Sequence, residues 1–306
     1  MTTNAPLRVT VLMGGPDQEH AVSLASGEAV TAALRRTERF VVEAMVIDKP
    51  DASELAQHRA DVFFPVLHGP WGEGGGIQRE LEQIGVPFVG SGSDAAGIAM
   101  DKIRTKDVAV DLGIPTPSWQ VLDGSTTRTL PPPLVLKPPA EGSSIDLWIH
   151  RDDTGLDDRI SSMLGRYDRM LAESCITGRE LTVGVVGTSA LPLVEIIPAG
   201  GIYDYEAKYN RDDTRYVIEP DLPPRLADTC RHHALALGRS LGCRDLYRVD
   251  FIADDEIPWM LEVNTMPGFT DHSLLPMAAA AAGQPMEHLC RELVLRAHAR
   301  GQEARS

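Results

Sequence analysis

The chain has 306 residues, 43% of them hydrophobic and 24% charged, which is typical of a globular protein with two or three domains. Its net charge of −15 argues against nucleic acid or an anionic membrane as a main partner, because both require a basic face. The four cysteines form no CxxC pair, so we expect reduced thiols and no zinc site. Residues 1–6 lack a secretory signal pattern, and the longest apolar stretch, near residues 277–282, is too short to span a bilayer. A cytoplasmic location is therefore expected.

The first 95 residues alternate between predicted strands and helices. Strands are expected at residues 7–12, 40–47, 62–67 and 87–89, and helices at residues 22–34 and 77–84. This alternation predicts a parallel sheet covered by helices. Ligands bind beyond the carboxyl ends of such strands, where the glycine loops at residues 14–15 and 69–76 lie.

The rest of the chain shows a different pattern. One helix is predicted at residues 97–113, followed by a proline-containing linker. Further strands are expected at residues 134–137, 171–173, 180–186 and 194–197, paired strands at residues 247–253 and 259–263, and helices at residues 225–241 and 285–299. Residues 199–224 are polar and lack periodicity, and a structureless segment of this length is usually functional.

Asp250, Glu262 and Asn264 lie in the two strands that are predicted to pair. Alternation puts Glu262 and Asn264 on one face, and Asp250 can join them from the neighbouring strand. Two carboxylates and an amide oxygen suit Mg²⁺ that bridges nucleotide phosphates. The alternative is a solvated strand face, but acidic and amide side chains inside apolar strands cover a core poorly.

Three separated lysines are candidates for neutralising a triphosphate. Lys137 ends a strand just before the loop Glu141-Gly-Ser-Ser144, whose N–H groups and hydroxyls can fold over phosphate. Lys102 lies in a helical stretch and Lys208 in the long polar segment. Taken singly, each is more often a surface lysine, and the chain has neither a P-loop nor a full GxGxxG motif.

Seven motifs occur in order along nearly the whole chain. They are Gly14-Gly15 with Glu19 and Val22-Ser-Leu24, His68-Gly-Pro-Trp-Gly-Glu73, Met100-Asp-Lys-Ile-Arg-Thr-Lys106, Lys137-Pro-Pro-Ala-Glu-Gly-Ser-Ser144, Tyr203-Asp-Tyr-Glu-Ala-Lys-Tyr209, Arg248-Val-Asp-Phe251 and Leu261-Glu-Val-Asn-Thr-Met-Pro-Gly268. Together they resemble the D-alanine–D-alanine ligases of the ATP-grasp superfamily. The resemblance implies an α/β ATP-grasp fold, with an N-terminal parallel-sheet domain at residues 1–95 and two α+β domains, at 96–175 and 176–306, that sandwich ATP.

The resemblance also implies roles for individual residues. The ATP-binding residues would be Lys102 and Lys137 at the phosphates, Lys208 over the γ-phosphate, Glu173 with the backbone of Cys175 and Ile176 at the adenine, and Glu180 at the ribose. Asp250, Glu262 and Asn264 would bind two Mg²⁺ ions, for which Mn²⁺ can substitute. Residues 199–224, with Lys208 and Tyr209, would form a lid that excludes water from a labile intermediate.

A second set of implied roles concerns the substrates. Glu19 would hold the ammonium of a first D-alanine with support from His68, Ser273 and Leu274 would meet the carboxylate of a second, and Arg248 with the Gly268 N–H would stabilise an oxyanion. Tyr209, Ser143 and Glu19 would latch the lid by hydrogen bonds. In the family, a tyrosine at the position of Tyr209 accompanies dipeptide formation rather than D-lactate ester formation.

The implied reaction is ATP-dependent joining of two D-alanines through an acyl phosphate, for peptidoglycan precursor synthesis, by a homodimer. One alternative is an ATP-grasp ligase of a specialised pathway that uses another D-amino acid or amine. Another is a nucleotide-binding paralogue without turnover. The sequence departs from the family pattern at Gly74, Asp146, Asp245 and Tyr247. Asp146 stands where a glycine usually follows, and we expect it to place negative charge near the phosphates, weakening nucleotide binding or shifting the loop.

Overall fold

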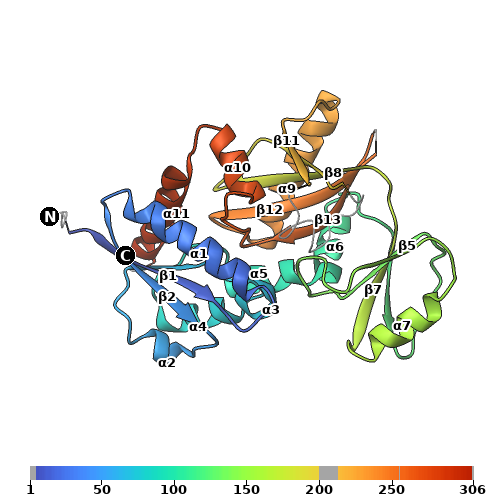
Figure 1. Cartoon of the computed structure of the whole chain (residues 1–306), viewed down its shortest axis with the longest axis horizontal. Coiled ribbons are helices and arrows are strands. Elements are labelled where there is room, and N and C mark those ends of the chain that lie inside the picture. Colours follow the sequence, from blue (N-terminus) through green and yellow to red (C-terminus); the bar gives the residue numbers. More distant parts are fainter. Residues whose placement is uncertain (1–4, 200–212, 255, 305–306) are drawn as a thin grey trace.

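The computed structural model describes residues 5–199, 213–254 and 256–304. Three sheets follow one another along the chain, and Figure 1 shows the middle sheet standing at the opposite end of the molecule from the N-terminal one. No helix in the described ranges is long and apolar enough to cross a membrane. The predicted fold class, an N-terminal parallel sheet followed by two α+β units, is confirmed.

The N-terminal sheet is parallel and has the strand order β2-β1-β3. Its elements are β1 (Leu7–Gly14), α1 (His20–Arg35), β2 (Phe40–Ile47), α2 (Ala52–Leu55), β3 (Val62–Pro65), α3 (Gly69–Gly72) and α4 (Gly76–Ile84). The strand expected at residues 87–89 is reduced to a single bridge between Phe63 and Phe88. Strand β3 ends two residues earlier than predicted, because its last residue is a proline and prolines interrupt a ladder.

The single helix predicted at residues 97–113 is wrong, because the structure has two helices there. Helix α5 (Ser93–Met100) ends before Asp101, and α6 (Lys102–Asp111) starts after it. Asp101 adopts an extended backbone, and its carboxylate accepts hydrogen bonds from the backbone N–H groups of Ile103 and Arg104 at 3.0 and 3.4 Å. An aspartate in this position begins a new helix. The break puts Lys102 in the first turn of α6.

The middle sheet is antiparallel, with the order β4-β7-β5-β6. It comprises β4 (Trp119–Asp123), β5 (Leu134–Lys137), β6 (Trp148–His150), α7 (Leu156–Leu164) and β7 (Arg169–Ser174). Leu156 and Met163 of α7 pack on the leucines of this sheet. Strands β5 and β7 were predicted, whereas β4, β6 and α7 were not.

The third sheet has the order β11-β10-β8-β12-β13, with β9 beside β8. Its elements are β8 (Arg179–Val186), β9 (Ser189–Ala190), β10 (Val194–Ile197), β11 (Arg215–Ile218), α9 (Pro224–Leu241), β12 (Leu246–Ala253) and β13 (Pro258–Asn264). Strand β11 lies inside residues 199–224, which were expected to be structureless, so that expectation was wrong for residues 215–218.

Helix α9 carries Gly238 against the ring of Tyr247, where a Cβ would lie 2.0 Å from Cζ. The large residue Tyr247 is therefore accommodated by a glycine in the facing helix.

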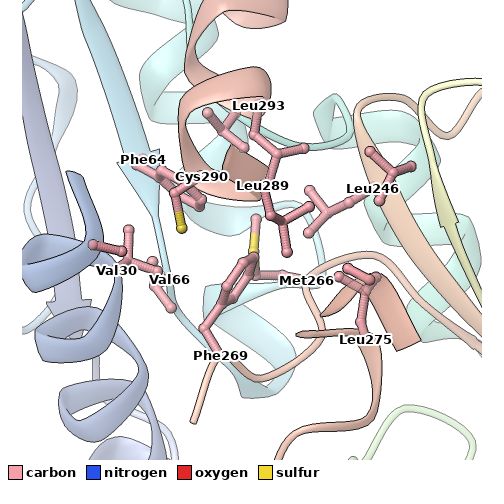
Figure 2. Packing of buried hydrophobic residues seen from close by; sticks show 14 of the residues in the cluster. Val30, Phe64, Val66, Leu246, Met266, Phe269, Leu275, Leu289, Cys290 and Leu293 are labelled. Atoms are coloured by element: carbon pink, nitrogen blue, oxygen red, sulfur yellow. The ribbon is translucent and has the colours of Figure 1, made fainter. Parts of the chain in front are cut away.

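The last two helices, α10 (Leu274–Ala281) and α11 (Met286–Glu303), return to the N-terminal sheet. Figure 1 shows α11 beside α1 and β1. Val30 of α1 and Phe64 of β3 share one buried cluster with Leu289 and Leu293 of α11 (Figure 2). Phe269 meets Phe64 edge-on, with ring centroids 5.6 Å apart. The first and last parts of the chain thus form one core.

A buried ion pair joins the same two parts at Asp245. The Asp245 carboxylate accepts two hydrogen bonds from Arg300 of α11, at 2.7 and 2.8 Å, and one from the Gly90 N–H at 2.9 Å. Arg300 also donates to the Phe88 carbonyl at 2.8 Å. The Asp245 side chain is 3% exposed, and its φ of 63° is one that aspartate tolerates better than most residues. This explains an aspartate where the family pattern has a small residue.

Replacing Asp245 with asparagine is predicted to destabilise the fold by about 3 kcal/mol, because the buried end of the pair would lose the charge that accepts from Arg300 and the Gly90 N–H. Urea unfolding measures the change. The matched control is Glu287→Gln, which removes an exposed partner of Arg36 between α11 and the end of α1 and is expected to cost less than about 1 kcal/mol. Equal effects of the two substitutions would contradict a special role for the Asp245 pair.

Candidate active site

Two adjoining cavities lie where the three sheets meet. The larger, about 580 Å³, is enclosed by the middle and third sheets, with Val135 and Ile149 on one side and Ile197, Ile252 and Leu261 on the other. Its lining includes the predicted nucleotide residues of the described chain, Lys102, Lys137, Glu173, Cys175, Ile176 and Glu180. An apolar slot with lysines and carboxylates at one end has the chemistry that a purine nucleotide needs.

The smaller cavity, about 70 Å³, is lined by the predicted substrate residues Glu19, His68, Ser143, Arg248, Gly268, Ser273 and Leu274. These residues come from the N-terminal part, the loop after β5, strand β12 and the start of α10. Glu262 lines both cavities. A group in one cavity can therefore reach a group in the other along the wall that contains Glu262.

That shared wall is formed by β12 and β13. Their antiparallel register places Asp250 opposite Glu262 and Arg248 opposite Asn264, so the four side chains share one face, as alternation predicted for the three metal candidates. Arg248 donates to both Asp250 oxygens at 2.8 Å, and Asn264 Nδ2 donates to Oδ2 at 3.1 Å. Glu262 lies 3.1 Å from the Lys102 ammonium. The wall is thus a preorganised set of opposite charges.

The donor set on this wall fits a hard divalent cation. Asp250 and Glu262 supply carboxylate oxygens, and the side-chain oxygen of Asn264 is an uncharged third ligand. In the described part of the chain, no group of three or more His, Cys, Asp or Glu side chains is placed to hold a metal. A protein set of two carboxylates and one amide matches Mg²⁺, which takes its remaining ligands from phosphates and water.

A buried ion triad supports Lys137 at the phosphate end of the large cavity. Glu173 Oε2 lies 2.7 Å from the Lys106 ammonium, and Oε1 contacts Lys137. Lys106 is fully buried and also donates to the Thr116 hydroxyl at 2.6 Å. Burial would raise the pKa of Glu173, but the charges of Lys137 and Lys106 outweigh it and hold the pKa below its usual value. The Glu173 carboxylate therefore stays ionised between the two lysines. The expected contact of Glu173 with adenine stays a prediction.

Two residues of this site escaped the sequence analysis. Lys106 belongs to the Met100–Lys106 motif, and its spacing of one helical turn from Lys102 was the available signal. Thr182 of β8 pairs with Asp250 across the sheet and donates to its Oδ1 at 2.6 Å. No local signal marks Thr182, because its role depends on which strands become neighbours.

The loop at residues 138–147 separates the two cavities. The Lys102 ammonium donates to the Glu141 carbonyl at 2.7 Å, and the Ser143 hydroxyl donates to the Glu19 carboxylate. The Asp146 carboxylate instead accepts hydrogen bonds from Arg166 and Tyr167, both at 2.6 Å, and Asp146 does not line the nucleotide cavity. Arg166 and Tyr167 thus bind the Asp146 carboxylate away from the lining of the nucleotide cavity, and its expected effect on nucleotide binding stays a prediction.

Buried titratable groups set the electrostatics of the small cavity. Burial lowers the pKa of His68, so this imidazole is neutral at physiological pH. Burial, together with the Glu19 charge, raises the pKa of Glu73 to about 8. Gly268 approaches Ser273 closely, because a Cβ on Gly268 would lie 2.8 Å from Oγ. Only glycine fits here without a shift of Ser273. Lys208 and Tyr209 lie outside the described residues.

A parallel sheet followed by two units that enclose a phosphate-neutralising cavity defines an ATP-grasp protein. Residues 110–295 match the family described as D-ala D-ala ligase C-terminus, and residues 48–91 match D-ala D-ala ligase N-terminus. The D-alanine–D-alanine ligase of Bordetella parapertussis is 44% identical over 95% of both chains. D-alanine–D-alanine ligase B of Chromobacterium violaceum is 41% identical over 95% of this chain and 98% of its own.

Solved structures agree with these sequence matches. The D-alanine–D-alanine ligase of Bacillus anthracis, in a complex with ATP, superposes with a TM-score of 0.85 at 30% identity, covering 99% of this chain and 100% of its own. The ligase from Coxiella burnetii gives the same TM-score at 24% identity, which supports the fold. The chain belongs to the D-alanine–D-alanine ligase family.

The buried triad generates a prediction for Glu173→Gln. This isosteric change leaves Lys106 and Lys137 without their shared counter-charge, so we expect a loss of about 3 kcal/mol in unfolding free energy and a rise of about tenfold in KM for ATP. Urea unfolding and steady-state kinetics measure the two effects. Glu219→Gln, which removes an exposed partner of Arg231, is the control. An unchanged KM for ATP would contradict the role of Glu173 in holding Lys137.

Proposed function

We propose that the protein joins two D-alanine molecules in an ATP-dependent reaction that supplies D-alanyl-D-alanine for peptidoglycan precursors. The observation that carries this proposal is the β12–β13 wall, where Glu262 lines both the nucleotide cavity and the small polar cavity. A phosphoryl group can thus pass from a nucleotide in one cavity to a carboxylate in the other. Family membership and the pairing of Arg248 with Asp250 support the same reaction.

The first step requires a carboxylate to attack the γ-phosphate of ATP, and two negatively charged partners must be brought together. Lys102 and Lys137 neutralise phosphate charge, while Glu173 and Lys106 hold Lys137 in place. Asp250, Glu262 and Asn264 would hold two Mg²⁺ ions, which supply further charge neutralisation when bound. The bond between the γ-phosphorus and the β–γ bridging oxygen breaks, so the products of this step are an acyl phosphate and ADP.

In the second step the neutral amine of the second D-alanine attacks the acyl carbon, and collapse of the tetrahedral intermediate forms the amide bond and releases inorganic phosphate and a proton. We assign Arg248 and the Gly268 N–H to the oxyanion that develops, since preorganised donors at this position give a large share of the rate. Ser273 and Leu274 begin α10, and the N–H groups of a helix start favour a carboxylate, here that of the second D-alanine. Glu19 would orient the ammonium of the first, with neutral His68 beside it.

The remaining assignments concern larger units. We propose domains at residues 1–95, 96–175 and 176–306, with ATP between the last two, and a lid at residues 199–224 in which Lys208 and Tyr209 act.

We also propose a cytoplasmic homodimer. The exposed edge strand β2, with Val41 and Val46 52% and 62% exposed, offers an apolar surface for a partner subunit.

Phosphate release from ATP and Mg²⁺ tests the function directly. Release is expected with D-alanine and not with L-alanine, and mass spectrometry should show the dipeptide. D-lactate and D-serine serve as further comparators. Turnover with another acceptor but not D-alanine would move the protein to the specialised-ligase alternative. ATP binding without release in any mixture would favour the paralogue without turnover.

Glu262→Gln tests the metal assignment. Loss of one carboxylate from the shared wall should lower kcat by at least about a hundredfold, and the melting temperature should fall slightly, because Lys102 also loses its partner. Raising the Mg²⁺ concentration should recover part of the rate. Glu292→Gln, on the surface of α11 beside Arg296, provides the control. Near-normal rates at modest Mg²⁺ would remove Glu262 from the metal set.

A further inference from the structure

The loop at residues 138–147 provides a wall for both cavities. It runs from the end of β5 to the start of β6. Ser144, Ile145 and Leu147 line the nucleotide cavity, and Ser143 lines the small one. Any change in the path of this short loop therefore alters both sites at once.

The backbone of the loop is in a costly conformation. Ser143, Ser144 and Asp146 have φ values of 49°, 57° and 53°, in the left-handed region that favours glycine. Each such residue costs on the order of 1 kcal/mol, with aspartate among the more tolerant types. Three of them within four residues require contacts that hold the loop in place.

Those contacts converge on the Asp146 carboxylate. Tyr167 and Arg166, which follow the end of α7, donate to it at 2.6 Å each. Arg159 of α7 stacks on the Trp148 ring, 3.6 Å from its centroid. Hydrogen bonds to an ionised acceptor are roughly twice as strong as neutral ones.

We propose that Asp146 is a positioning residue for the nucleotide: anchored by Tyr167 and Arg166, it fixes the loop at residues 138–147 against the ATP cavity. The loop is then tied at three places, by Asp146 to the residues that follow α7, by Ser143 to Glu19 and by the Glu141 carbonyl to Lys102. Asp146 lines neither the nucleotide cavity nor the small cavity, so it acts through Ser144, Ile145 and Leu147. The inference rests on the proposed ATP-dependent function.

Binding of ADP by calorimetry and KM for ATP in the ligase assay test this role. Asp146→Ala should weaken ADP binding and raise KM for ATP by about tenfold, with a smaller change in kcat, because only the loop path is altered. Asp146→Gly should behave in the same way, since it relieves the backbone strain but lacks the anchor. Tyr167→Phe, which removes one donor, should give a change of about threefold.

Asp153→Ala is the matched control, because Asp153 forms a comparable but exposed ion pair with Arg128 in the same part of the chain. Asp153→Ala should leave ADP binding, KM for ATP and kcat unchanged. Melting temperatures separate a loss of folding from a loss of positioning, and Tyr167→Phe remains informative if an Asp146 variant fails to fold.

Repulsion between Asp146 and phosphate predicts the opposite result. If Asp146 acted mainly by repelling phosphate, Asp146→Ala and Asp146→Gly would tighten ADP binding. Tighter or unchanged binding in folded variants would overturn the anchor. Failure of the wild type to release phosphate with D-alanine would instead reject the proposed function, while the ADP measurements would still decide the role of Asp146.

Discussion

The antiparallel register of β12 and β13 is the constraint on which the site depends. It sets Asp250 opposite Glu262 and Arg248 opposite Asn264, and the neighbouring strand β8 adds Thr182 to the same cluster. A slip by one residue would turn these side chains to the opposite face. Strand β12 is paired on both sides, which makes such a slip costly. The chemistry of the wall is therefore a direct consequence of strand pairing.

Charge in this protein is distributed unevenly, and the site shows why. The chain carries a net charge of −15, yet Lys102, Lys106 and Lys137 gather at one end of the nucleotide cavity. Each is held by a carboxylate, Glu262 or Glu173. Burying such pairs seldom adds stability, because desolvation offsets much of the attraction. Their value lies in presenting fixed cations to a polyanionic ligand.

Local sequence patterns predicted the long elements and the shared face of Asp250, Glu262 and Asn264, because alternation along a strand is a local property. They failed at Asp101, where helix capping overrode a continuous helical pattern, and at β6, which has only three residues. Strand β11 was hidden in a polar segment. The link between Lys106 and Glu173 could not be predicted either, since α6 packs against β13 of the third sheet and Lys106 reaches β7 of the middle sheet from there. The motifs of the family supplied the site residues that periodicity alone could not.

The return of α11 to the N-terminal sheet has a consequence for the order in which the protein can form. Val9, Val11 and Phe64 are buried against a cluster that includes Leu289 and Leu293, nearly a whole chain length away. During synthesis, the first strands leave the ribosome long before their cover exists. Contacts so distant in sequence also slow folding, because a long loop must close first. The nascent chain thus carries an uncovered apolar face until its last helix arrives, and this face can aggregate during that interval.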